Sequence, residues 1–315
     1  MNDPLPPAVF LMGPTASGKT AIAAALVKRF PFEIISVDSA LVYRGMDIGT
    51  ARPEASLLAA APHRLIDIRD PADPYSAAEF REDALREMAD ITAQGQVPLL
   101  VGGTMLYFRA LEQGLSAMPP ANPEMRAALE QELQEAGLEA LYQRLQQVDP
   151  AAAARIHSND PQRIQRALEV FQLTGQPLSD FHEQGREPPL PWRLIKIILA
   201  PEDRAHMQLR VERRFRAMLD AGFVDEVRGL VGRGDLAAEL PAMRAVGYRQ
   251  VRDFLAGGLS YEEMVNQAIV ATRQYAKRQL TWLRREENAR WFAAEDDAVV
   301  DEIAGHLECC LKQRK

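Results

Sequence analysis

Short apolar runs alternate with amphipathic stretches over the first hundred residues of the chain, and one more apolar run follows much later. This alternation is typical of a parallel sheet wrapped by helices. The predicted strands are 8–12, 33–37, 64–68, 97–101 and 193–199. The predicted helices between them are 18–29 and 76–94, and the second begins with a capping box formed by Ser76 and Glu79. The chain is therefore expected to have an α/β fold with a parallel sheet flanked by helices.

The pattern changes at residue 116, and up to residue 190 only helices are predicted. Three sites place a good N-cap residue directly before a proline, which suits the first helical turn: Asn122-Pro123, Asp149-Pro150 and Asp160-Pro161. We therefore expect residues 116–190 to form an all-helical insertion domain between two strands of a core made of 1–115 and 191–315. Two further helices are expected after the last strand, one from near Asp203 to Gly222 and one beginning at Ser260.

A Gly-x-x-x-x-Gly-Lys-Thr motif follows the first predicted strand directly and opens the first predicted helix, which is the context that a phosphate-binding loop requires. Glycines allow successive backbone N–H groups to face one anion, and the helix N-terminus and a lysine add positive charge. The threonine hydroxyl is placed to hold Mg²⁺. The loop comprises Gly13, Pro14, Thr15, Ala16, Ser17, Gly18, Lys19 and Thr20, and the motif alone suggests a nucleotide such as ATP without specifying the ligand.

Composition narrows the class of protein. The 315 residues are 47% hydrophobic and 26% charged, as in a globular enzyme, and no apolar run reaches the length of a membrane span. The first four residues lack the basic stretch of a signal peptide, and the adjacent pair Cys309-Cys310 does not suit a disulfide, so a reduced, cytoplasmic protein is expected. The net charge of −7 argues against non-specific nucleic-acid binding but leaves room for local basic surfaces, because arginines are concentrated at 204–216 and 273–285.

Two polar segments lie at the carboxyl ends of predicted strands, where open α/β sheets bind ligands. Asp38 follows the strand 33–37, and Gly102-Gly103-Thr104 follows the strand 97–101. Asp38 either holds metal or accepts a proton, or it only caps the next segment. The Gly-Gly-Thr segment either borders a bound phosphate or is an ordinary turn with a threonine N-cap. The residue types alone leave both alternatives open.

Arginines also gather on predicted helices. Gln162, Arg163 and Arg166 lie on one side of the helix that starts at Pro161, whereas Ile164 lies on its buried side. Arginines near a helix N-terminus oppose the helix dipole, which suggests an anionic ligand, although a solvated polar face is the alternative. A second cluster contains Arg210, Arg213 and Arg214.

Six ordered segments together resemble the bacterial tRNA dimethylallyltransferases, and the resemblance extends from the first strand to about Trp282. These segments are 13–20, 38–53, 102–107, 160–169, 244–250 and 275–282. The resemblance implies transfer of a dimethylallyl group from dimethylallyl diphosphate to N6 of the adenosine 3′ of the anticodon in certain tRNAs. It carries no information about residues beyond about 286.

The resemblance also implies roles for individual residues. Lys19, and Thr20 through Mg²⁺, stabilise the leaving diphosphate, and Arg213 is a second clamp on it. Asp38 accepts the proton of the adenine amine, and Thr104 lies near both reactants. The implied tRNA contacts are Asp38, Ser39, Ala40, Leu41, Thr104, Arg126, Gln162, Arg163, Ile164, Gln165, Arg166, Arg244, Gly247 and Tyr248. The expected partners are the anticodon stem-loop of tRNA and dimethylallyl diphosphate, without a membrane, and the expected state is a monomer.

Two other functions use the same phosphate loop. In a P-loop small-molecule or nucleoside kinase, the helical insertion would be a lid whose arginines neutralise the transferred phosphoryl group. A tRNA-binding or GTPase-like regulatory module without chemistry is disfavoured, because the chain has no convincing Asn-Lys-x-Asp segment to read guanine.

Overall fold

A computed structural model describes residues 5–183 and 190–312. The chain divides into two compact units, with boundaries between residues 111 and 112 and between 190 and 191. The predicted insertion, 116–190, starts a few residues later and ends at the same place. Residues 1–4, on which the expectation about the N-terminus rests, and residues 184–189 of the predicted insertion lie outside the described residues. No helix in the described residues combines the length and the apolar character needed to cross a membrane.

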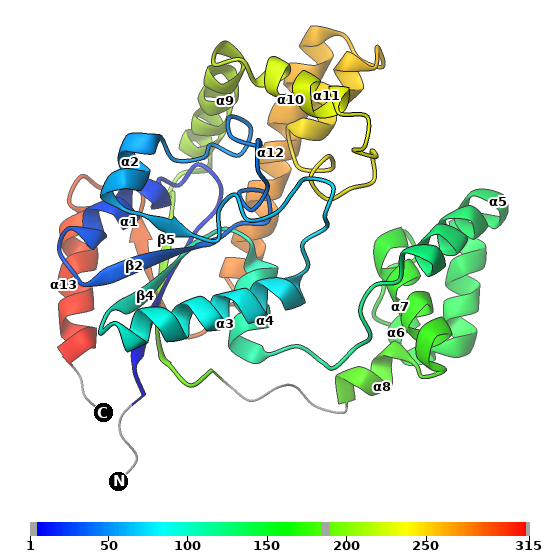
Figure 1. Cartoon of the computed structure of the whole chain (residues 1–315), viewed down its shortest axis with the longest axis horizontal. Coiled ribbons are helices and arrows are strands. Elements are labelled where there is room, and N and C mark those ends of the chain that lie inside the picture. Colours follow the sequence, from blue (N-terminus) through cyan, green and yellow to red (C-terminus); the bar gives the residue numbers. More distant parts are fainter. Residues whose placement is uncertain (1–4, 184–189, 313–315) are drawn as a thin grey trace. The chain divides into compact units, whose positions relative to one another are not determined.

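The first unit is built on a six-stranded sheet in the order β3-β2-β4-β1-β5-β6, and all of its pairs are parallel (Figure 1). The strands are β1 (Pro7–Met12), β2 (Phe32–Val37), β3 (His63–Arg64), β4 (Val97–Gly102), β5 (Arg193–Ala200) and β6 (Ala289–Ala293). The predicted α/β class with a parallel sheet is therefore confirmed. The strand expected at 64–68 is wrong in extent, because only His63 and Arg64 pair with β2.

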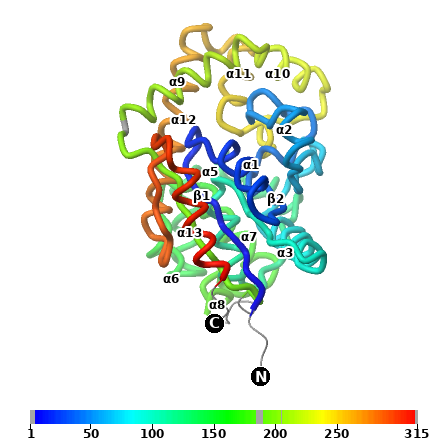
Figure 2. Tube along the Cα trace, turned by 90° about the vertical axis from the view of Figure 1, so that its left-hand side faces the viewer, coloured from blue at the N-terminus to red at the C-terminus, as the bar shows by residue number. Residues whose placement is uncertain are grey.

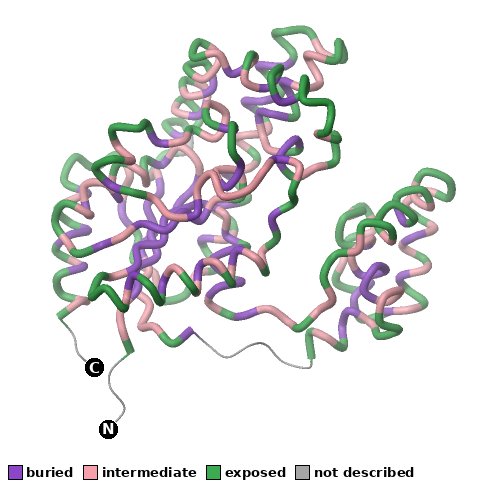
Figure 3. The backbone as a smooth tube through the Cα atoms, in the orientation of Figure 1, coloured by how far each residue is buried: buried purple, intermediate pink, exposed green. Residues whose placement is uncertain are grey.

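Helices cover both faces of the sheet. On one face, Val9 and Leu11 pack with Leu26 of α1 (Lys19–Val27) and Leu307 of α13 (Val299–Lys312) in one buried cluster. The traces of β1, α1 and α13 can be followed in Figure 2. On the other face, the ring of Phe10 lies 5.0 Å from that of Phe108 in α4 (Met105–Gln113), beside α3 (Ala77–Ala93). The strands accordingly form the buried centre of this unit (Figure 3).

The segment after residue 286, for which the sequence implied no role, completes this unit. β6 pairs with β5, and α13 packs against α1. Trp291 in β6 is exposed and Phe292 is buried, so this edge strand has the alternation of a half-covered strand over only five residues. Such a short pattern is weak evidence in a sequence.

A helical layer lies beyond the carboxyl edge of the sheet, within the same unit (Figure 1). α12 contacts both α9 and α11, and α10 contacts the same two helices. The helices of this layer are α9 (Arg204–Asp220), α10 (Phe223–Gly232), α11 (Tyr248–Leu255) and α12 (Tyr261–Leu283). A further short helix, α2 (Ala55–Ala60), lies between β2 and β3 in the chain. The predicted capping boxes at Ser76 and Ser260 are both confirmed.

The second unit contains only helices among its described residues: α5 (Pro123–Val148), α6 (Pro150–Ala153), α7 (Pro161–Thr174) and α8 (Leu178–Glu183). Asn122, Asp149 and Asp160 accept hydrogen bonds from the first turns of α5, α6 and α7, as the Asx-Pro pairs predict. Gly175 ends α7 with a φ of 70°, a left-handed conformation that favours glycine. Leucines and alanines of α5 and α7 form the core of this unit.

Candidate active site

The phosphate loop joins the buried end of β1 to α1. Gly13 is required by packing, because a Cβ at this position would lie 2.2 Å from the carbonyl oxygen of Leu199 in β5. Gly18 is the N-cap of α1 and has a φ of 89°, a conformation that is strained for other residues. Gly13 therefore allows the loop to lie close against β5, and Gly18 allows the loop to lead directly into the N-terminus of α1.

Lys19 is held by the loop to which it belongs. Its Nζ donates to the carbonyl oxygen of Pro14 at 2.7 Å and to Oγ of Ser17 at 3.3 Å. Burial, with the positive charges of Arg214 and Arg210, lowers the pKa of Lys19 to about 7, although the negative charge of Asp38 opposes the shift. The site therefore concentrates positive charge that an anion would stabilise.

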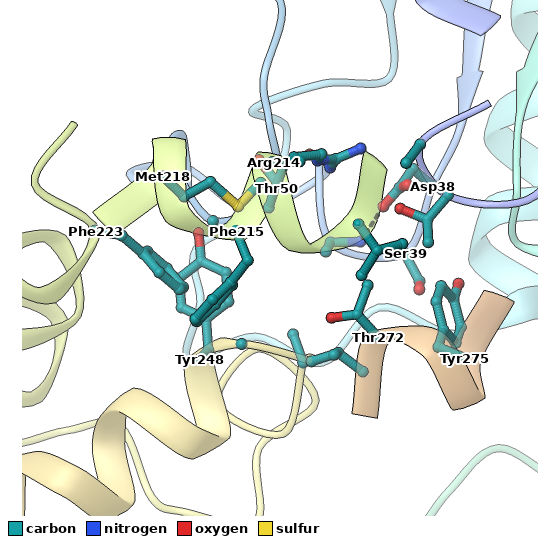
Figure 4. Close-up of a pocket in the computed structure, with 18 of the residues that line it drawn as sticks. Asp38, Ser39, Thr50, Arg214, Phe215, Met218, Phe223, Tyr248, Thr272 and Tyr275 are labelled. Carbon is teal, nitrogen blue, oxygen red and sulfur yellow. Dashed lines mark hydrogen bonds between the residues drawn. The ribbon is translucent and has the colours of Figure 1, made fainter. Parts of the chain in front are cut away.

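Two adjoining cavities lie along this loop. The first, of about 360 Å³, is called the phosphate cavity and borders residues 15–21, the Gly102-Gly103 turn and Ser36. The second, of about 330 Å³, is called the apolar cavity. The two cavities share Thr15, Ala16, Asp38, Thr50, Arg214 and Tyr275. A ligand can therefore extend from the phosphate loop into the apolar cavity past Asp38 and Arg214 (Figure 4).

The far end of the apolar cavity is hydrophobic. It is lined by Val211, Phe215, Met218, Phe223 and Tyr248 (Figure 4). The ring of Phe223 meets that of Tyr248 edge to face, with centroids 4.9 Å apart. Gly49 completes this wall, because a Cβ there would lie 2.1 Å from the Phe223 ring and 2.5 Å from the Tyr248 ring. This end accommodates an apolar group or a base rather than a second phosphate.

The carboxylate of Glu226 stabilises this wall of the cavity through hydrogen bonds. Glu226 in α10 accepts hydrogen bonds from the N–H groups of Asp47 and Ile48 at 2.9 and 2.6 Å and from that of Gly49 at 3.1 Å. It also accepts from the Tyr248 hydroxyl at 2.6 Å. Burial, followed by the negative charge of Glu226, raises the pKa of Tyr248. Tyr248 therefore lines the cavity while its hydroxyl is bonded to Glu226.

Of the two alternatives for Asp38, the structure shows a capping interaction, and a role with metal or a proton stays a prediction. Its Oδ1 accepts from the N–H groups of Ala40 at 2.8 Å and Leu41 at 3.2 Å, so the side chain caps a turn rather than a helix. The same side chain lines both cavities. Within the described residues, the hydrogen bonds of Asp38 all fall on Oδ1, which makes Oδ2 the oxygen available to a ligand.

Thr104 contacts the residue that follows Asp38 in the chain. Its Oγ1 accepts from the N–H of Ser39 at 3.1 Å. Burial, followed by the negative charge of Asp38, raises the pKa of Tyr275 to about 12. Thr104 lies outside the residues that line the two cavities, so in this structure it supports the segment that carries Asp38.

Arg213, which the resemblance implied to be a second diphosphate clamp, lies outside both cavities in this structure. Arg213 is exposed on α9 and lines neither cavity, whereas the next residue, Arg214, lines both. Arg214 also donates to the carbonyl oxygen of Thr50 at 3.5 Å. Arg210, one turn earlier, places Nη2 3.3 Å from the position of a Cβ on Gly18. Because successive helical residues point about 100° apart, only one of the adjacent pair can face the loop.

A divalent cation fits the donor set of the phosphate cavity. Thr20, Ser36 and Asp38 all line it, and hydroxyl and carboxylate oxygens suit Mg²⁺. The described residues contain no group of three or more His, Cys, Asp or Glu side chains that could hold a metal ion. A cation here would therefore depend on oxygens of the bound diphosphate as well as on the protein.

Two of the residues expected to contact RNA in the second unit, Arg126 and Arg166, pair with a buried carboxylate. Glu169 in α7 is 1% exposed and accepts from Arg126 Nε at 3.0 Å and from Arg166 Nη1 at 2.7 Å. Gln162 and Arg163 are exposed at the start of α7, and Gln165 donates to Glu130 at 2.8 Å. The side chain of Ile164 is fully buried in the core of this unit, so of this residue only the backbone could contact RNA.

Of the segment 244–248, Arg244 is exposed and lines the apolar cavity together with Gly247 and Tyr248. Sequence reasoning assigned no individual role to Gln279, Glu226, Tyr275 or Arg214. The spacing of Tyr275 and Gln279, four residues apart on one helix, is the signal that could have placed them on one face.

The parallel sheet, the loop at its central strand and the cavity beside that loop define a P-loop α/β protein. The model of the family described as IPP transferase matches residues 41–286. The chain belongs to this family, which confirms the resemblance found in the sequence.

Related proteins match the sequence of this chain over almost its whole length. A tRNA dimethylallyltransferase of Thioalkalivibrio sulfidiphilus is 60% identical over 306 residues, which are 96% of each chain. The crystal structure of a tRNA isopentenylpyrophosphate transferase of Bacillus halodurans is 37% identical, with a TM-score of 0.72, over 98% of this chain and 97% of that one. A structure of a eukaryotic dimethylallyltransferase acting on tRNA has a TM-score of 0.80 at 23% identity, over 98% of this chain and 81% of the other, and supports the fold alone.

Proposed function

We propose that this enzyme transfers a dimethylallyl group from dimethylallyl diphosphate to N6 of the adenosine 3′ of the anticodon in tRNA and releases diphosphate. The observation that carries the proposal is the adjacency of the two cavities, with Lys19 at the cationic end, an apolar end, and Asp38 and Arg214 where the cavities meet. The 60% identical tRNA dimethylallyltransferase supports the same activity. The enzyme acts as a monomer in the cytoplasm, where tRNA is available.

In this reaction the C–O bond between the allylic carbon and the diphosphate breaks, and a C–N bond to N6 forms. Negative charge therefore builds on the leaving diphosphate. Loop N–H groups, Lys19 and Arg214 are placed to stabilise that charge, and they are held in position before the reaction begins. Mg²⁺ held with the help of the Thr20 hydroxyl would supply further charge neutralisation to the diphosphate oxygens.

The adenine amine is a weak nucleophile, because its lone pair is delocalised into the ring, and it must lose a proton as the C–N bond forms. Asp38 Oδ2 accepts that proton, while Oδ1 stays fixed by the N–H groups of Ala40 and Leu41. Thr104 holds the backbone next to Asp38, because its Oγ1 accepts a hydrogen bond from the N–H of Ser39. The two-point attachment of Oδ1 orients the carboxylate toward the junction of the cavities.

The target adenosine must leave its stack to reach a cavity of this kind. Exposed arginines on the second unit, Arg126 and Arg163, together with Gln162, offer phosphate and base contacts to an unpaired anticodon loop. Arg244 is placed to contact the RNA at the mouth of the apolar cavity. A few arginines suffice for such contacts, so the net charge of −7 does not oppose them.

The deciding experiment incubates the protein with an anticodon stem-loop, Mg²⁺ and dimethylallyl diphosphate labelled in the prenyl group. The expected result is label on the RNA with release of one diphosphate per transfer, and no label on a stem-loop with guanosine in place of the target adenosine. A kinase would instead convert ATP to ADP and phosphorylate an acceptor. Unlabelled RNA together with ATP-dependent phosphorylation would overturn the proposal.

A further inference from the structure

Gln279 of α12 joins two loops of the site that are far from it in sequence. Its side chain is 5% exposed, and both ends of the amide are used. Oε1 accepts from the N–H of Thr15 in the phosphate loop at 2.8 Å, and Nε2 donates to the carbonyl oxygen of Gly103 at 2.8 Å. A single amide thus connects the loop after β1 to the loop after β4.

The loop after β4 leaves room for the amide of Gln279 because it has a glycine, Gly103, at the point of contact. A Cβ at Gly103 would lie 2.4 Å from Nε2 of Gln279, so any larger residue there would displace the side chain. The same Cβ would lie 3.1 Å from the carbonyl oxygen of Gly13 in the phosphate loop. Gly103 therefore allows the two loops and the amide to approach one another closely.

The connection continues to the segment that carries Asp38. Thr104 follows Gly103 directly in the chain, so the carbonyl group that Gln279 holds is bonded to the backbone nitrogen of Thr104. Thr104 Oγ1 in turn accepts from the N–H of Ser39, the residue after Asp38. Two hydrogen bonds of Gln279, the peptide bond between Gly103 and Thr104, and the hydrogen bond from Ser39 to Thr104 therefore connect the phosphate loop to the backbone beside Asp38.

We propose that Gln279 is a positioning residue for the transfer reaction: it fixes the phosphate loop, and with it the bound diphosphate, relative to Asp38. This inference rests on the proposed function. Reacting groups must be aligned to well under an ångström for efficient transfer, and a displacement of about 1 Å can cost about a hundredfold in rate. An amide that holds both sides of the site at once is suited to this task.

Two substitutions separate positioning from general stability. Gln279→Met keeps the length and helix propensity of the side chain but removes both hydrogen bonds. Gln279→Glu keeps an acceptor for the Thr15 N–H but places a carboxylate against the carbonyl oxygen of Gly103. Gln274→Met is the matched control, because Gln274 lies on the same helix and is exposed.

In Gln279→Met we expect kcat to fall at least about tenfold, with KM for the stem-loop RNA within about twofold of wild type. The affinity for inorganic pyrophosphate with Mg²⁺, measured by calorimetry, should fall severalfold. Hydrogen exchange in the peptide containing Thr15 should be faster. The Gln279→Glu variant should lie between Gln279→Met and wild type, and Gln274→Met should match wild type in all four measurements.

A lowered Tm with kcat, pyrophosphate affinity and Thr15 exchange all unchanged would overturn the inference, because the amide would then only support the fold. Pyrophosphate affinity and exchange need no transferase activity. If wild-type protein transfers no prenyl group, the proposed function fails, and these two measurements still test the role of Gln279. If Gln279→Met does not fold, Gln279→Glu gives the same readouts: wild-type values in this variant would contradict the inference.

Discussion

The ammonium group of Lys19 donates a hydrogen bond to the carbonyl oxygen of Pro14, 2.7 Å away, within its own phosphate loop. Burial, together with the positive charges of Arg214 and Arg210, lowers its pKa to about 7. In the ligand-free protein this lysine therefore titrates near neutral pH. A bound diphosphate favours the charged form and raises the pKa, so binding and protonation are linked.

The first prediction concerns this linkage. At about pH 6 Lys19 already carries its proton, so it contributes no proton uptake on binding pyrophosphate with Mg²⁺. At about pH 8.5 the free protein holds Lys19 neutral, and binding should take up close to one additional proton, with weaker affinity than at low pH. Calorimetry in two buffers of different ionisation enthalpy measures the uptake. The Lys19→Met variant reports protons taken up by the ligand alone, and an uptake at high pH equal to that of wild type would exclude Lys19 as the linked group.

The second prediction tests Asp38 as the base. In Asp38→Asn the side-chain oxygen can still accept from the N–H groups of Ala40 and Leu41, so the turn should persist. The amide cannot accept the amine proton, and kcat should fall by about 10²–10⁴-fold with little change in stem-loop affinity. Single-turnover kinetics and RNA binding are the measurements. Turnover close to that of wild type would remove Asp38 from this role.

The third prediction uses two adjacent arginines. Arg214 lines both cavities and Arg213 is exposed on the same helix, so the pair differs in position but not in chemistry. Arg214→Ala should lower kcat/KM for dimethylallyl diphosphate about 10²–10³-fold, as expected when a donor to developing negative charge is removed. Arg213→Ala should stay within about threefold. A larger loss of kcat/KM in Arg213→Ala than in Arg214→Ala would instead support Arg213 as the diphosphate clamp.

Some features of this protein follow from local sequence and others depend on tertiary packing. The phosphate loop, the three Asx-Pro helix starts and the two capping boxes were predictable, because each depends on residues within a few positions of one another. The distinction between Arg213 and Arg214 was not, since it depends on how α9 is turned against the loop. Ile164 was assigned to RNA by its place in a shared motif, although its periodicity indicated the core that it occupies.

Long-range contacts account for the rest of what the sequence missed. Gln279 bonds to Thr15 and Gly103, residues 264 and 176 positions away, and nothing near Gln279 in the sequence identifies them. Glu226 is equally inconspicuous on α10, yet it holds the 47–49 segment against the apolar cavity. In both cases the side chain acts on distant backbone atoms, whose place in space depends on the fold rather than on residue type.

The last prediction concerns the buried carboxylate of the second unit. Burial alone would raise the pKa of Glu169, but hydrogen bonds from Arg166, the Asn122 N–H and Arg126 outweigh it and lower the pKa. Its stabilising contribution is therefore present above the ordinary glutamate pKa and is lost as the pH falls through the lowered value. Glu169→Gln should cost roughly 1–3 kcal/mol of stability, less than a fully buried pair, because Arg126 is 56% exposed.

The same substitution distinguishes orientation from net charge in RNA binding. If Glu169 holds Arg126 and Arg166 in the geometry that RNA requires, Glu169→Gln should weaken stem-loop binding even though it removes a negative charge. Glu139→Gln is the matched control, because Glu139 has the same charge and lies in the same unit but bonds to Gln143 instead of an arginine. It should leave the affinity unchanged or raise it slightly. Tighter binding in both variants would mean that the arginines act only through their charge, and that the carboxylate between them serves the stability of the helical unit alone.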